Sequence, residues 1–187
     1  MPRKSVTALL AQADADLPNN STQLITAADV RNMVKDITDT YAPGYAAVSI
    51  ATLLLPALGV VPQLITYNTQ IVLTTDYTVN LAAGTITRIA GGLAATFNRV
   101  SFYAGVAAPN GNEVVFQLYR DGAIVPGGVS VSALGAGNVA QASFSLPTAV
   151  ADNANHVYDV RATKTSGGAD NVTLTNVRFI FEYVPTV

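Results

Sequence analysis

Apolar residues near the start of the chain recur at the spacing of a short helix. The pattern predicts a helix over about residues 5–14, with Ser5 as its N-terminal cap. Residues 17–20, Leu-Pro-Asn-Asn, end this helix, because proline lacks a backbone donor and asparagine favours turns. One side of the helix would carry Val6, Leu9 and Leu10.

A second, better specified helix is predicted to begin after Thr26, a natural N-cap. Asp29 follows three residues later, as in a capping box, and Ile25 and Val30 hold the positions of a hydrophobic staple. Charged residues fill the other faces, and residues 42–44, Ala-Pro-Gly, end the helix. The apolar stripe at helical spacing comprises Val30, Met33, Val34, Ile37 and Tyr41.

These two helices form a predicted N-terminal arm over residues 1–44, and a single narrow stripe cannot make a core of its own. One possibility is that the stripe packs on the chain's own β domain or on the same helix of sister chains. The other is that the arm docks onto another protein in an assembly. The expected assembly residues are Leu9, Leu10, Ile25, Val30, Met33, Val34, Ile37 and Tyr41.

Residues 45–63 are predicted to be an apolar, extended linker that is buried or lines an interface. Residues 45–61 form the longest uncharged apolar run, and Pro56 and Gly59 interrupt it. A membrane helix needs about 20 continuous apolar residues. The prolines and the glycine therefore favour an extended segment, and we expect no membrane partner.

From residue 64 to residue 187 the pattern changes to period-two alternation punctuated by turns. In residues 113–120 every second side chain is apolar, and Asp121-Gly122 then favours a hairpin turn. Roughly eight to ten short strands at this spacing predict a mainly β fold, an antiparallel jelly-roll sandwich. The predicted strands are 71–74, 77–80, 84–89, 95–105, 113–120, 128–133, 140–146, 157–165 and 172–184.

The charge of the chain is low and unevenly spread. Charged residues make up 12% of the sequence, against about a quarter in an ordinary soluble domain. No charge lies between Asp39 and Asp76, and none lies between Asp121 and Asp152. Sheets with so few charges on their outer faces usually lie against something, so we expect partners, either copies of the same chain or a larger assembly.

Composition argues against several kinds of chemistry. The ten Lys and Arg residues are scattered, whereas nucleic-acid binding needs clustered cations. There is no cysteine and only one histidine, His156, which fits a surface turn or, less simply, a catalytic role. Residues 152–155 resemble a calcium loop only superficially, because the downstream glutamate is missing. We therefore expect no catalytic residues, no cofactor and no metal.

The tyrosines allow one ligand hypothesis. Their aromatic faces could form a sugar-binding platform, although strand tyrosines commonly lie at the core rim or at an interface. The six candidates are Tyr67, Tyr77, Tyr103, Tyr119, Tyr158 and Tyr183.

Two stretches of the chain resemble known phage proteins. Residues 9–20, LLAQADADLPNN, and residues 25–37, ITAADVRNMVKDI, resemble the start of many tailed-bacteriophage virion proteins, in which such an arm precedes a β domain. More loosely, GTIT at 84–87, FNRVSFYAG at 97–105 and FQLYRDG at 116–122 are similar to tumour-necrosis-factor-like jelly rolls of phage structural proteins.

The resemblance implies a virion component without enzymatic activity, usually a homotrimer, assembled in the bacterial host cytoplasm. Such proteins occur as capsid decoration, or cement, proteins and as fibre or receptor-binding proteins. The compact chain without a fibrous repeat favours a decoration protein whose partners are its own copies and the major capsid protein or another virion protein. The alternative is a short head or tail fibre that recognises a host surface glycan.

Overall fold

The computed structural model describes residues 11, 12, 15, 27–41, 44–89, 96–108, 113–132, 139–150, 154–165 and 169–184. The helix with defined bounds is α2 (Ala27–Tyr41), which begins directly after the predicted cap Thr26 and has Asp29 in its first turn. An acidic residue there stabilises a helix by interacting with its dipole. The other arm helix was predicted over residues 5–14, most of which lie outside the described residues. Ala11 and Gln12 of that segment are described and are helical, but α2 is the one helix of the described arm with defined bounds, so the predicted two-helix arm is not shown.

The described remainder of the chain is almost entirely β structure. The short strands near the start are β2 (Gln63–Leu64), β3 (Thr69–Leu73), β4 (Tyr77–Asn80) and β5 (Thr85–Arg88). The longer strands are β1 (Gly44–Leu58), β6 (Thr96–Ala107), β7 (Glu113–Arg120), β8 (Ala123–Ser132), β9 (Ala140–Val150), β10 (His156–Lys164) and β11 (Asp170–Val184).

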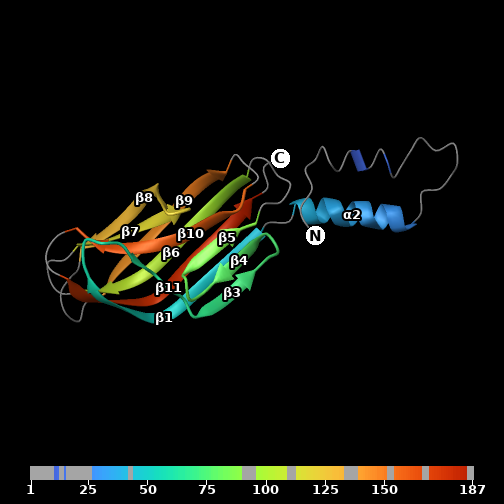
Figure 1. Cartoon of the computed structure of the whole chain (residues 1–187). Coiled ribbons are helices and arrows are strands. Elements are labelled where there is room, and N and C mark those ends of the chain that lie inside the picture. The colour runs from blue at the N-terminus through green and yellow to red at the C-terminus, as the bar shows by residue number, and fades with distance from the viewer. Residues whose placement is uncertain are drawn as a thin grey trace.

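These strands form two antiparallel sheets packed face to face (Figure 1). The order is β3-β1-β11-β6-β9 in one sheet and β4-β5-β10-β7-β8 in the other, where β2 also pairs with β10. From β5 to β6, from β6 to β7 and from β8 onward, each connection crosses to the opposite sheet. The longer strands thus interleave as in a jelly roll, and the predicted antiparallel jelly-roll sandwich is confirmed.

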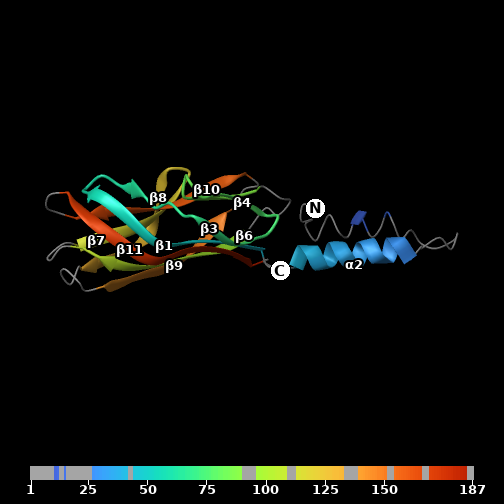
Figure 2. The ribbon, with the colours of Figure 1, turned by 90° about the horizontal axis from the view of Figure 1, so that it is seen from below.

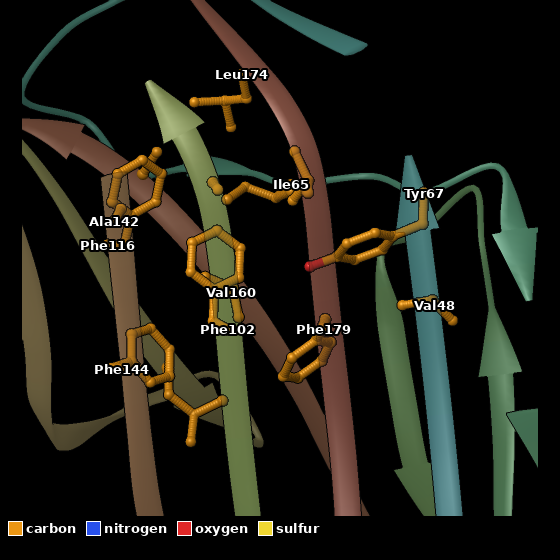
Figure 3. Packing of buried hydrophobic residues seen from close by; sticks show 14 of the residues in the cluster. Val48, Ile65, Tyr67, Phe102, Phe116, Ala142, Phe144, Val160, Leu174 and Phe179 are labelled. Carbon is orange, nitrogen blue, oxygen red and sulfur yellow. The ribbon is translucent and has the colours of Figure 1, made fainter. Parts of the chain in front are cut away.

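Alternation along the strands explains where the core lies. In β11, Val177, Phe179 and Phe181 are fully buried, while Arg178 between them faces outward, as the sequence predicted. Figure 3 shows Phe102 of β6 among aromatic rings from both sheets. Its ring centroid lies 5.2 Å from that of Phe116 and 5.5 Å from that of Phe144. Such ring contacts add to the area term and close the core between the layers.

The largest difference from the sequence analysis is β1. Most of the segment predicted as a linker, 45–63, is this strand, which hydrogen-bonds to β11 along its length and to β3 near its start. Pro56 is compatible with the strand because it lies beyond the β3 pairing, at a register shift between Leu55 and Leu58 where Ala57 has φ 50°. The segment is extended, but it is part of the sandwich.

The turn between β7 and β8 follows the sequence closely. Asp121 and Gly122 have φ values of 51° and 81°, the left-handed conformations that a two-residue hairpin with the right twist requires. Asp121 also accepts a hydrogen bond from the backbone N–H of Val157 at 2.9 Å, so the turn is fixed to β10. The predicted hairpin is confirmed.

Candidate assembly surface

The arm helix α2 exposes part of its apolar stripe. Val30, Val34 and Ile37 are 44%, 54% and 42% exposed. Met33 is half-buried. Figures 1 and 2 show α2 lying beyond one end of the sandwich in both views, and not across either sheet. A surface helix normally buries such a stripe, so the stripe is a candidate contact with something outside the sandwich.

The other predicted arm residues are described less fully. Tyr41 is the last residue of α2, and its side chain lies outside the described part of the structure. Leu9, Leu10 and Ile25 lie outside the described residues. The assignment of the whole stripe to assembly therefore stays a prediction.

A second candidate contact is β3, at the edge of its sheet. All five of its residues are exposed, including Ile71 at 54%, Val72 at 42% and Leu73 at 37%. The register with β1 shifts so that Ile71 is the extra residue of a bulge. A bulge is one device that discourages edge pairing, but β3 lacks the charges that usually accompany it.

Two other edge strands carry a proline. β8 contains Pro126 and a register shift against β7, and β9 contains Pro147. Proline removes a backbone donor and so hinders pairing with another strand. Among the described edge strands, β3 exposes the most large apolar side chains and contains no proline.

The outward faces of the two sheets differ in how they hold charge. On the β10 face, Arg161 pairs with Asp159 at 2.7 Å and lies 4.1 Å from the centroid of the Tyr119 ring. The hydrogen bond to Asp159 raises the pKa of Arg161 further above its usual range. On the β11 face, Arg99 and Glu182 are 3.9 Å apart and more exposed. Small uncharged residues cover most of the β11 face.

The β11 face also contains a hollow of about 440 Å³. Its lining residues are Tyr103, Asn176, Arg178 and Ile180. Sequence analysis named Tyr103 but missed the other three. The available signal was a change of phase, because the buried Leu174 and Val177 are three residues apart and not two or four.

The six-tyrosine platform is wrong. Tyr67, Tyr77 and Tyr158 belong to the core, and Tyr119 is covered beside Arg161 on the outward β10 face; all four are at most 6% exposed. Burial, and secondarily the charge of Asp159, raise the pKa of Tyr67 well above its usual value, so this phenol stays neutral. Tyr103, 45% exposed, remains available on the surface. The Tyr183 side chain lies outside the described part of the structure.

His156 has a structural contact. Its Nδ1 lies 2.6 Å from Oδ2 of Asp121, and its side chain is 12% exposed. The pair joins the start of β10 to the β7–β8 turn. His156 therefore lies in a strand and contacts a turn, and it is not itself in the predicted surface turn. Among the described residues, no group of three or more His, Cys, Asp or Glu is arranged to hold a metal ion.

Lys164 is the most deeply buried charge. Its side chain is fully buried and its ammonium contacts the carboxylate of Asp170, which is 36% exposed. Lys164 ends β10 and Asp170 begins β11, so the pair closes the connection between these strands.

In the part of the chain that is described, no helix has the length and apolar character needed to span a membrane.

The chain matches no established protein family, and no curated protein matches it in sequence. Among solved structures it is similar to the globular domain of the zebrafish complement 1qA protein, with a TM-score of 0.48 and 10% identity. That similarity covers 78% of this chain and 98% of the other.

Two further solved structures are similar over much of the chain. For the PRD1 vertex protein P5 the TM-score is 0.46 at 10% identity, covering 76% of this chain and 97% of that one. For murine APRIL at pH 5.0 the TM-score is 0.48 at 4% identity, covering 76% and 100%. At these values the similarities assign neither a family nor a function to this chain, and the fold assignment rests on its own strand order.

Proposed function

We propose that this chain is a non-enzymatic structural protein of a bacteriophage virion, a trimeric capsid decoration protein that stabilises the head by bridging capsid subunits. The observation that carries the proposal is the exposed apolar stripe of α2 next to a sandwich whose core is already closed. Val30 and Ile37 are exposed outside that core, so burying them requires contacts that the folded sandwich does not provide.

Two features support the virion location and the self-association. The α2 segment and the residues before it carry the arm sequence that resembles phage virion proteins. The exposed, uncharged β3 edge offers a second contact at the same end of the molecule as the arm, because Leu73 pairs with Ala46 near the start of β1. In this proposal the arm anchors the protein to the major capsid protein or another virion protein, and the apolar surfaces join the copies.

The test introduces a charge into the stripe of the full-length protein. Ile37→Glu should reduce co-sedimentation with phage particles that lack the protein by at least about tenfold, because burying an unpaired carboxylate is strongly unfavourable. The trimer mass measured by analytical ultracentrifugation would show whether the same stripe also joins the copies. Asn32→Glu places the same charge on the polar side of α2 and should leave co-sedimentation unchanged. Equal binding by the two variants would refute the arm as the anchor.

A second candidate function, a short fibre that recognises a host glycan, is favoured by one observation. The hollow beside Tyr103 and Arg178 is open and combines an aromatic ring with a cation.

A further inference from the structure

The hollow on the β11 face is formed by a bulge. Between Thr175 and Arg178 the register of β11 against β6 shifts, and Asn176 has φ 51°. Val177 stays in the core, so the bulge adds Asn176 as an extra outward side chain beside Arg178. Gly105 lies opposite Thr175, and a Cβ there would press on the Thr175 hydroxyl. The backbone of both strands is thus adapted to this irregularity, and bulges commonly re-aim side chains next to binding sites.

The charge of the hollow favours an anionic ligand. Arg178 is exposed, and its cross-strand neighbours are the uncharged Ser49 on β1 and Tyr103 on β6. Among the described residues of this face, the ion pair is Arg99–Glu182, and no carboxylate is paired with Arg178. A guanidinium binds a carboxylate through two parallel hydrogen bonds, which gives geometry as well as charge.

The remaining lining groups suit a sugar ring. Tyr103 is 45% exposed and Ile180 lies half-buried beside it, so together they offer an apolar surface to the C–H face of a pyranose. Asn176 supplies an amide that both donates to and accepts from hydroxyl groups. The volume of about 440 Å³ lies within the range of small-molecule sites, roughly 300–1,000 Å³.

We propose that this hollow binds a saccharide that carries a carboxylate, such as a uronic acid residue. Arg178 holds the carboxylate, the Tyr103 ring packs on the sugar's C–H face, and Asn176 bonds its hydroxyl groups. A neutral sugar would leave the guanidinium unused, and an acidic peptide would not use the ring and the amide together. The proposal names the ligand class of the second candidate function, and it does not require that the arm anchor the protein to a capsid.

The test is calorimetric titration of the full-length protein at low salt with two probes. These are an oligoglucuronate and the neutral oligosaccharide of the same linkage and length. The acidic probe should bind at least about tenfold more tightly, a difference of about 1.4 kcal/mol. Arg178→Gln should abolish that preference, whereas Arg99→Gln, which removes the same charge from the same face outside the hollow, should leave it unchanged.

The aromatic contact is tested separately. Tyr103→Ala should weaken binding of the acidic probe by about tenfold, and Tyr103→Phe should retain it, because the ring makes the proposed contact. Equal affinity for both probes, no binding of either probe, or equal competition by an acidic peptide would overturn the proposal. The proposal would also be overturned if the unmodified protein bound no saccharide and Tyr103→Ala lowered the oligomer mass. That result would mean that a second copy of the chain covers the hollow. Particle binding through α2, measured on the same variants, reports on the proposed function independently.

Discussion

The sandwich and the arm contain similar apolar side chains, but the sandwich buries them and the arm exposes them. In the sandwich, Phe102, Phe179 and their neighbours are fully buried between two sheets of the same chain. In α2, Val30 and Ile37 remain more than 40% exposed. Under the proposed function, folding and assembly depend on separate parts of the chain.

Two of the buried charges in the sandwich are paired within it. Lys164 is buried with its partner Asp170, and Asp159 is buried beside Arg161. Paired charges of this kind are tolerated inside a fold because each offsets the desolvation of the other. These charges are thus compensated within the sandwich, whereas the exposed apolar side chains of α2 and β3 would gain buried area from a partner.

The largest expected effect lies in the core. Phe102→Ala removes a fully buried ring that contacts Phe116 and Phe144, and should lower the free energy of unfolding by about 3–5 kcal/mol. Ile37→Ala on α2 should change it by less than about 0.5 kcal/mol, as exposed positions do. Urea unfolding of both variants, monitored by circular dichroism, checks the contrast. A loss of more than about 2 kcal/mol in Ile37→Ala would show that the stripe packs within the chain and would remove the distinction between the two regions.

A smaller effect is expected at the buried ion pair. Asp170→Asn leaves the Lys164 charge buried with a weakened partner and should cost about 3 kcal/mol, less than for a fully buried pair because Asp170 is partly exposed. Lys164→Met removes the buried charge itself and should stay within about 1 kcal/mol of the unmodified protein. Thermal and urea unfolding of both single variants and of the double variant measure these changes in the free energy of unfolding.

The double variant shows why Asp170→Asn loses stability. If the cost of Asp170→Asn arises from the buried ammonium, adding Lys164→Met should restore most of the lost stability. A cost that persists in the double variant would mean that Asp170 acts mainly through the backbone at the start of β11. None of these variants should alter particle binding, which would sharpen the separation between sandwich and arm.

The sequence was sufficient where one face of a strand is buried and the other is not. In β7, Val114, Phe116 and Leu118 alternate with half-exposed residues, and the predicted and observed strands coincide. The hairpin at Asp121 and Gly122 was equally predictable from the sequence, because few residue pairs adopt left-handed backbone conformations at two successive positions. Jelly-roll architecture followed from the number and spacing of such strands.

β1 could not be recognised in this way. Leu53, Leu54 and Leu55 form a continuous apolar run, and such a run reads alike as a strand, a linker or an interface segment. What makes it a strand is pairing with β11, more than a hundred residues later, which local pattern does not encode. The prediction that the tyrosines form an exposed platform was wrong for a related reason. The periodicity separates the two faces of a strand, but it does not show which face the other sheet covers.

The hollow was hidden by the bulge itself. A period of two counted forward from Val172 and Leu174 puts Asn176 and Arg178 on the core side, whereas one counted back from Val177 puts both outward, and the pattern alone does not locate the bulge that separates the two phases. Only the coordinates bring Tyr103 from β6 beside these two residues. The proposed partner of the α2 stripe is a different case, because neither the sequence nor the described fold contains it.

The smallest expected effect concerns pH and the turn that joins β7 to β8. Burial alone would raise the pKa of Asp121, but hydrogen bonds from His156 and from the Val157 N–H, with the positive charges of His156 and Arg120, lower it overall. A lowered folded-state pKa stabilises the protein above the unfolded value of about 3.9, and this contribution is lost as the pH falls through the folded-state pKa. Asp121→Asn keeps the φ of 51° accessible but removes the charge, so it should destabilise the protein by less than about 1 kcal/mol at pH 6, since the site is partly exposed.

That difference should disappear when urea unfolding is repeated at progressively lower pH, below the folded-state pKa of Asp121. His156→Gln should reduce the same acid dependence without removing the carboxylate, which distinguishes the histidine contact from the Val157 hydrogen bond. Because the turn is built from residues of the sandwich alone, particle binding through α2 should follow pH in the same way in both variants and in the unmodified protein. A particle-binding profile that shifted with Asp121→Asn would connect the turn to assembly and would contradict the proposed division between a sandwich that folds and an arm that attaches.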